Sequence, residues 1–138
     1  MIYAVVDTNV LVSALLTHNI DASTAKIVQA LLKQIITPLY NEEILSEYSE
    51  GLKRPKFGFS KRTVNKYVNA IKKLGLQAER LHSSEHFPDP KDIVFYEVAL
   101  SKEDAYLVTG NTKHFPQKPI VVTPAEMVEI LAENGLLE

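Results

Sequence analysis

The chain has 138 residues and a net charge of −2, with 46% hydrophobic and 23% charged residues. These values are typical of one soluble globular domain, so we expect a single domain over residues 1–138. The absence of cysteine excludes a disulfide framework, thiolate chemistry and cysteine-based metal sites. Because no signal-peptide pattern occurs and the apolar runs are too short to cross a bilayer, we expect a cytoplasmic protein without membrane contact.

Short β-branched runs predict strands, and apolar residues recurring every three or four positions predict helices. In chain order, the predicted elements are a strand at 2–6, helices at about 10–17 and 22–33, a strand at 35–38, helices from 41 to about 53 and from 60 to about 74, a strand at 76–81, a helix at 89–101, strands at 105–110 and 120–122, and a final helix from 124. Strands that alternate with helices predict an α/β fold around a mostly parallel sheet.

Several helix ends carry specific signals in the sequence. Pro55 ends one helix, because proline disfavours a helical conformation in the residue before it. Ser60 is a suitable N-cap for the next helix, which Gly75 ends. Thr123 and Glu126 have the spacing of a capping box, which marks the start of the last helix.

Polar residues follow two of the predicted core strands. Asp7 comes directly after the strand at 2–6, and Asn111 follows the strand at 105–110. In parallel α/β sheets the functional crevice lies at the carboxyl ends of the strands, so these residues meet there if their strands are neighbours. The alternative is that Asp7 only caps the helix that follows it.

The helix from residue 41 contains four glutamates. At 100° per residue, Glu43 and Glu50 lie nearly opposite the apolar face and are expected in solvent. Glu47 lies at one border of that face, where a carboxylate can reach inward. Glu42 lies at the other border and is not excluded by this geometry.

Two aspartates lie at the start of the helix predicted at 89–101. Asp89 precedes a proline and Asp92 lies three residues later, so both have a structural explanation as helix-capping and first-turn acids. The alternative is that either carboxylate contributes to the same crevice as Asp7.

A basic segment lies between residues 53 and 73, which include eight lysines or arginines and no acid. It is a candidate surface for a polyanion such as RNA, in which Lys61, Arg62 and Lys66 would contact phosphates. Tyr67 and either Phe57 or Phe59 could stack on bases, although core packing explains each of them at least as well. The alternative is an amphipathic helix whose lysines only face solvent.

Five motifs occur together along the chain: DTNV after the first strand, SEY on a helix, a K-R-P-K-F segment, D-x-x-F-x-x-x-A on a later helix, and LVTGNTKHF. In order and spacing they resemble the PIN domain, in particular the toxin components of toxin–antitoxin systems related to VapC. The resemblance covers residues 2 to about 127. It implies a three-layer α/β/α fold with a central, mostly parallel sheet of four to five strands.

The resemblance also implies a site. Asp7, Glu47 and Asp92 match the acidic positions that would bind Mg²⁺ or Mn²⁺, and Asn111 matches the position after the fourth strand. The residues that would orient these carboxylates through hydrogen bonds are Thr8, Asn9 and Thr109. Many relatives have a fourth acid at Asn111 or in the loop after it, whereas Asn111 offers an oxygen without charge.

The chemistry of these residues agrees with phosphodiester hydrolysis, which needs an activated water and neutralised charge, both of which a hard cation on oxygen ligands supplies. We therefore expect a metal-dependent ribonuclease that acts as the toxin of a toxin–antitoxin pair, with RNA, an antitoxin and a second copy of the chain as partners in a homodimer or higher oligomer. The alternative is a PIN domain that binds nucleic acid without catalysis.

The histidines lack zinc-type spacing and are interpreted as surface or loop residues: His18, His82, His86 and His114.

Overall fold

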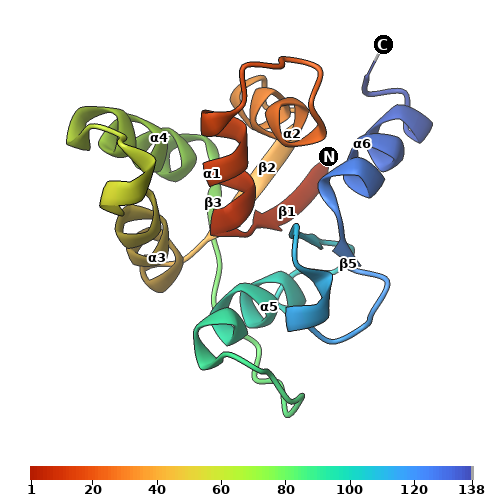
Figure 1. Ribbon diagram of the computed structural model, residues 1–138. Coiled ribbons are helices and arrows are strands. Elements are labelled where there is room, and N and C mark those ends of the chain that lie inside the picture. Colours follow the sequence, from red (N-terminus) through yellow and green to blue (C-terminus); the bar gives the residue numbers. More distant parts are fainter. Residues whose placement is uncertain (138) are drawn as a thin grey trace.

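Five parallel strands form the central sheet (Figure 1). In this computed structural model, which describes residues 1–137, they are β1 (Ile2–Val6), β2 (Ile36–Tyr40), β3 (Leu76–Gln77), β4 (Tyr106–Val108) and β5 (Val121–Val122). Their spatial order is β3-β2-β1-β4-β5, so β1 is central and pairs with β2 on one side and β4 on the other. The predicted α/β class with a mostly parallel sheet is confirmed.

Six α-helices surround the sheet within residues 1–137: α1 (Thr8–Leu16), α2 (Ser23–Leu32), α3 (Glu42–Leu52), α4 (Lys61–Leu74), α5 (Ile93–Leu100) and α6 (Pro124–Glu133). The same residues include the short 3-10 turns η1 (Pro55–Phe57), η2 (Pro90–Asp92) and η3 (Thr112–His114). Helix α5 packs on β1, β2 and β4, whereas α2 and α4 pack on β2. In Figure 1, α2 and α5 lie on opposite sides of β1, as the predicted three layers require.

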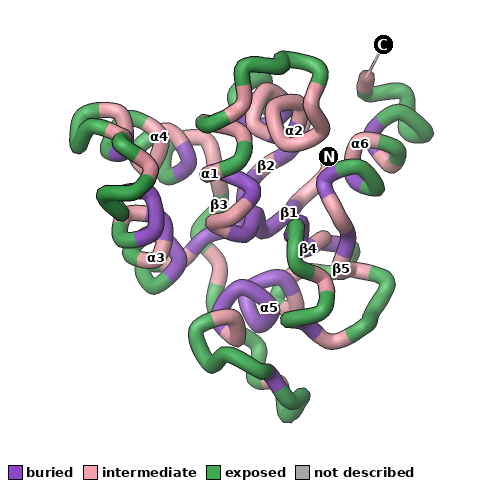
Figure 2. The backbone as a smooth tube through the Cα atoms, in the orientation of Figure 1, coloured by how far each residue is buried: buried purple, intermediate pink, exposed green. Residues whose placement is uncertain are grey.

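Buried residues are concentrated in β1 and α5, among other elements (Figure 2). Ala4, Val5 and Val6 are at most 1% exposed, because both faces of β1 are covered. Helix α5 is apolar on nearly all sides, and its residues 94–99 are buried. None of the helices in residues 1–137 is long and apolar enough to cross a membrane.

The capping signals in the sequence are confirmed. The Thr63 N–H donates to the Ser60 hydroxyl oxygen at 3.1 Å, which caps α4. At the start of α6, Thr123 and Glu126 exchange both bonds of the capping box. These bonds satisfy backbone N–H groups that a helix start otherwise leaves without a partner.

Gly75 ends α4 as predicted, but its backbone is not left-handed, because φ is −95°. A Cβ at this position would overlap the carbonyl oxygen of Pro38 in β2 and would lie 2.7 Å from the carbonyl oxygen of Ile71. The residue is therefore a glycine because the end of α4 passes very close to β2, and a side chain would separate the two elements.

The predicted strand at 76–81 is wrong beyond Gln77. Strand β3 pairs with Leu39 and Tyr40, and β2 ends at Tyr40, so the following residues have no strand to pair with. Residues 78–87 form no helix or strand and are fastened instead to Glu97 of α5. The Glu97 carboxylate accepts hydrogen bonds from the Arg80 side chain at 2.8 Å and from the Ser83 N–H at 2.7 Å.

Two helix starts also differ from the prediction. Helix α1 begins at Thr8, two residues before the expected start, so Asp7 occupies the N-cap position. The helix expected at 89–101 begins as the 3-10 turn η2 and is α-helical only from Ile93. Both differences lie beside the candidate acids, where the chain leaves one element and enters the next.

Helices α1 and α3 approach each other closely at Gly51. A Cβ at Gly51 would lie 2.6 Å from the Cγ2 methyl carbon of Thr8. Glycine inside a helix costs about 1 kcal/mol relative to alanine, so the close contact explains why the position has no side chain. The contact holds the first residue of α1 against the last turn of α3.

We predict that Gly51→Ala lowers the free energy of unfolding by about 1 kcal/mol, because overpacking costs about 1–3 kcal/mol and exceeds the gain in helix propensity. Thr8→Ser removes the methyl group, so Gly51→Ala should be neutral or stabilising in that background. Urea unfolding of the four proteins of this cycle measures both effects. Stabilisation by Gly51→Ala in the presence of Thr8 would contradict the close contact.

Candidate active site

Asp7 lies at the carboxyl edge of the sheet, where β1 and β4 run side by side. Its N–H donates to the carbonyl oxygen of Val108 at 2.9 Å, which extends the strand pairing by one residue. Its carboxylate accepts a hydrogen bond from the buried Thr109 hydroxyl at 2.8 Å. Asp7 is only 8% exposed, so its carboxylate lies at the base of any site at the carboxyl edge of the sheet.

The structure tests the alternative that Asp7 is only a helix cap. The residue occupies the N-cap position of α1, but its side chain makes no capping hydrogen bond. Its carboxylate instead accepts the hydrogen bond of the Thr109 hydroxyl, across the sheet. Capping therefore does not explain the carboxylate.

Helix α3 is fastened to the same edge by Tyr48. The Tyr48 hydroxyl, which is buried, donates to the carbonyl oxygen of Val6 at 2.5 Å. The preceding residue, Glu47, is half-buried and lines the cleft described below. The other glutamates of α3, Glu42, Glu43 and Glu50, are exposed and lie outside this cleft. The helical geometry predicted this position for Glu43 and Glu50.

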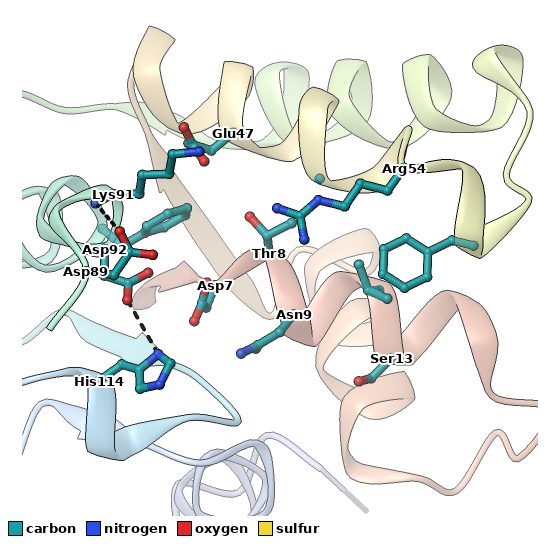
Figure 3. Close-up of a pocket in the computed structure, with 14 residues that line it drawn as sticks. Asp7, Thr8, Asn9, Ser13, Glu47, Arg54, Asp89, Lys91, Asp92 and His114 are labelled. Atoms are coloured by element: carbon teal, nitrogen blue, oxygen red, sulfur yellow. Dashed lines mark hydrogen bonds and ion pairs between the residues drawn. The ribbon is translucent and has the colours of Figure 1, made fainter.

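The η2 turn brings two more aspartates to this edge. Asp89 caps the turn by accepting a hydrogen bond from the Lys91 N–H at 3.0 Å. The side chain of Asp92 is 17% exposed, and its Oδ2 atom is buried without a hydrogen-bond partner in the described part of the chain. The His114 ring lies beside it, with Nδ1 3.6 Å from Oδ2 (Figure 3).

These residues surround a cleft of about 290 Å³ (Figure 3). Its lining comes from the residue after β1, from α1, α3 and α5, and from the η1, η2 and η3 turns with the residues that precede them: Asp7, Thr8, Asn9, Val12, Ser13, Glu47, Gly51, Arg54, Phe57, Asp89, Lys91, Asp92, Phe95 and His114. Segments that are far apart in sequence thus bring four carboxylates to one place. The three acids that the sequence analysis singled out are among them.

Asn111 does not line this cleft, although the sequence analysis grouped it with the acids. Its side chain is exposed, and its N–H donates to the Thr109 hydroxyl oxygen at 3.0 Å. The η3 turn that follows carries the chain past the edge and brings His114 to the cleft in its place. The interpretation of His114 as an ordinary loop residue therefore missed a lining residue.

The three expected supporting residues behave differently. Thr109 is completely buried and bonds Asp7 directly. The Asn9 side-chain oxygen accepts from the Gly110 N–H at 3.3 Å, so Asn9 holds the exit of β4 rather than a carboxylate. Thr8 lines the cleft, with its methyl group against α3.

The basic residues chosen from the sequence lie away from the cleft. Lys61, Arg62 and Lys66 are exposed on α4, and none of them lines it. The cations that do line it are Arg54 and Lys91. Arg54 belongs to the K-R-P-K-F motif, so the sequence contained a sign of its position, whereas no sequence pattern pointed to Lys91.

Negative charge is crowded in the cleft. Burial, followed by the charges of Asp7 and Asp89, raises the pKa of Asp92 to about 6, although His114 offsets part of the rise. Burial also raises the pKa of Asp7. A carboxylate costs free energy when it is both buried and close to other carboxylates, and a cation placed between them removes that cost.

The donor set fits a hard divalent cation. Carboxylate oxygens are the ligands that Mg²⁺ and Mn²⁺ prefer, and the unpartnered Oδ2 of Asp92 is a free ligand atom. In the side-chain conformations of this structure, no three acids or histidines within residues 1–137 are arranged closely enough to hold a metal ion. Metal binding would therefore require Glu47 or Asp89 to turn towards Asp7 and Asp92, or to act through water.

A family model of the PIN domain matches residues 3–113 of the chain. The matched span runs from β1 into the η3 turn and includes the three acids singled out from the sequence. No curated protein matches the chain.

We predict that Asp92→Asn stabilises the metal-free protein by about 1–2 kcal/mol at pH 8. The pKa of Asp92 is about 6 in the folded protein, above the ordinary value of about 3.9, so its ionised form destabilises the fold above pH 6. This cost falls as the pH drops from about 6 to 4, where the carboxyl is protonated in the folded protein and about half protonated in the unfolded chain. Urea unfolding in EDTA at pH 8, 6 and 4 measures the change.

Glu50→Gln is the matched control, because Glu50 is an exposed carboxylate of α3 outside the cleft. It should change stability little at any of the three pH values. A gain from Asp92→Asn that is absent at pH 8, or equally large at pH 4, would contradict the crowding of charge in the cleft.

Proposed function

The chain belongs to the PIN domain family, whose members are typically nucleases, and from that premise we propose that it is a divalent-metal-dependent ribonuclease that hydrolyses RNA phosphodiester bonds. The observation that carries the proposal is the buried Oδ2 of Asp92, which has no hydrogen-bond partner in the described chain, on a residue that lines the same cleft as Asp7. A buried polar atom without a partner costs about 1–3 kcal/mol. A bound cation would supply the missing partner.

The residues of the cleft have separate tasks in this proposal. Asp7 is a fixed metal ligand, because the Thr109 hydroxyl holds its carboxylate in one orientation. Asp92 offers a free oxygen, and Glu47 approaches from α3 either directly or through water. When bound, Mg²⁺ or Mn²⁺ supplies an activated water and neutralises charge on the scissile phosphate. Asn111, which the motif places with the catalytic residues, would act only from outside the cleft.

We further propose that this ribonuclease is the toxin of a VapC-like toxin–antitoxin pair. This part of the proposal rests on the motifs in the sequence. Such a role implies an antitoxin protein as a partner and a homodimer or higher oligomer. Lys61, Arg62 and Lys66 would contact RNA phosphates along α4, beyond the cleft itself. Contacts of this kind hold a strand without reading its sequence.

A PIN domain that binds nucleic acid without cleaving it is the second candidate. Two observations favour it: no acid stands at Asn111, and no three acids or histidines within residues 1–137 already form a metal-holding group. The two candidates differ in whether metal-dependent cleavage occurs, so one assay separates them.

We predict that Asp7→Asn and Asp92→Asn each reduce Mn²⁺-dependent cleavage of a mixed RNA pool by more than about a hundredfold, since loss of even an outer partner of a metal ligand costs about 10- to 100-fold. Glu47→Gln should have nearly the same effect. RNA binding should remain, because the metal acts on the transition state whereas the basic residues hold the strand. Gel analysis of cleavage, with and without EDTA, measures the loss.

Glu50→Gln serves as the control in this assay, because its exposed side chain lies outside the cleft. Cleavage that survives both EDTA and Asp7→Asn would contradict the metal-dependent mechanism. Failure of the unmodified protein to cleave any RNA pool would favour the non-catalytic candidate.

A further inference from the structure

The cleft has a second wall that the acids do not explain. Arg54 and Phe57 both line it, one turn apart at the junction of α3 and η1, where the Phe57 N–H donates to the Arg54 carbonyl oxygen at 3.1 Å. Figure 3 shows Arg54 across the cleft from Asp92 and His114. The η2 turn therefore carries two aspartates on one side of the cleft, and the junction of α3 and η1 carries a guanidinium group and an aromatic ring on the other.

Core packing does not explain Phe57. Among the partly buried apolar residues of the described chain that pack against the core, Phe59 is included and Phe57 is not. Phe57 is partly exposed, and its ring rests on Phe59, with ring centroids 5.9 Å apart and planes 25° from parallel. Phe59 thus acts as a support, and Phe57 is held at the cleft by a neighbour that is itself anchored.

Arg54 also has no structural partner. It is exposed and forms no ion pair with any residue from 1 to 137. Arg80, by contrast, pairs with both Glu43 and Glu97. A guanidinium group is suited to bidentate contacts with a phosphate, and Arg54 offers its donors at the edge of the cleft.

We propose that Arg54 and Phe57 form a nucleotide subsite beside the acids, in which the guanidinium group contacts a phosphate and the base of the same strand stacks on the Phe57 ring. The subsite deepens the proposed ribonuclease function and rests on it for the choice of RNA. A base in a duplex is stacked on both faces, so the subsite selects single-stranded RNA.

One neighbour must move when a base enters. The Lys56 ammonium lies 5.2 Å from the centroid of the Phe57 ring. A cation–π contact at an exposed site is weaker than the stacking of a base on an aromatic ring, so a base displaces the ammonium. The displaced lysine remains beside the strand and can contact a phosphate.

The test measures binding in the Asp7→Asn background with Mg²⁺, so that cleavage does not consume the probe. The probes are fluorescein-labelled decauridylate, a decamer of abasic ribose phosphates and a ten-base-pair RNA duplex. Phe57→Leu should weaken decauridylate binding about tenfold and leave binding of the abasic decamer unchanged. The duplex should bind more weakly than decauridylate. Equal effects of Phe57→Leu on decauridylate and the abasic decamer, or no effect on either, would overturn the subsite.

Tyr3→Leu is the matched control. Tyr3 also carries a lysine over its ring, with Lys102 Nζ 4.2 Å from the centroid, but it does not line the cleft. Tyr3→Leu should bind every probe like its parent. Arg54→Gln should weaken decauridylate and the abasic decamer by the same factor and reduce the salt slope by about one, because it removes a phosphate contact. An effect of Arg54→Gln on decauridylate alone would overturn the phosphate assignment.

A second readout does not depend on affinity. The chain contains no tryptophan, so the indole introduced by Phe57→Trp reports from this position alone. Its emission should be quenched by decauridylate and not by the abasic decamer, and absence of quenching would overturn base stacking. Wild-type cleavage is scored separately. Cleavage without a Phe57 effect overturns this inference alone, and a Phe57 effect without cleavage overturns the ribonuclease activity alone.

Discussion

The parallel pairing of β1 with β4 is the constraint on which the cleft depends. Its register places Val6 beside Val108, so the residues that follow, Asp7 and Thr109, lie next to each other at the carboxyl edge. The Thr109 hydroxyl then holds the Asp7 carboxylate at 2.8 Å. A slip of one residue would turn these side chains to the opposite faces of the sheet and remove Asp7 from the cleft.

The chain contains two kinds of buried carboxylate, and the contrast distinguishes a structural acid from a functional one. Glu97 on α5 is 5% exposed and fully partnered, since it pairs with Arg80 and accepts the Ser83 N–H. Arg80 also pairs with Glu43 and so joins α3 to α5, the helices beside the cleft. Asp92, directly before α5, has a buried oxygen without a hydrogen-bond partner in the described part of the chain. The structural carboxylate of Glu97 thus has hydrogen-bond partners within the fold, whereas the Asp92 carboxylate, at which we propose that a metal binds, lacks one.

Local patterns predicted most of the strands and helices, because these depend on the periodicity of apolar residues. Asp7 was a candidate because it directly follows a buried strand, at the edge where parallel sheets bind ligands. Helical geometry set aside Glu43 and Glu50, and the resemblance to PIN domains then selected Glu47 and Asp92. The loop at residues 78–87 was missed, because alternation predicts a strand even where no neighbouring strand remains to pair with it. The cleft position of His114 was missed as well, because it depends on how the η3 turn folds back after Asn111.

The central claim is that Asp7 and Asp92 together bind one divalent cation at the carboxyl edge of the sheet. Titration calorimetry with Mn²⁺ tests it most directly, on the unmodified protein, Asp7→Asn, Asp92→Asn and the exposed control Glu50→Gln. The account predicts binding by the unmodified protein and the control, and at least about tenfold weaker binding by each aspartate variant. Equal Mn²⁺ affinity in all four proteins would contradict it.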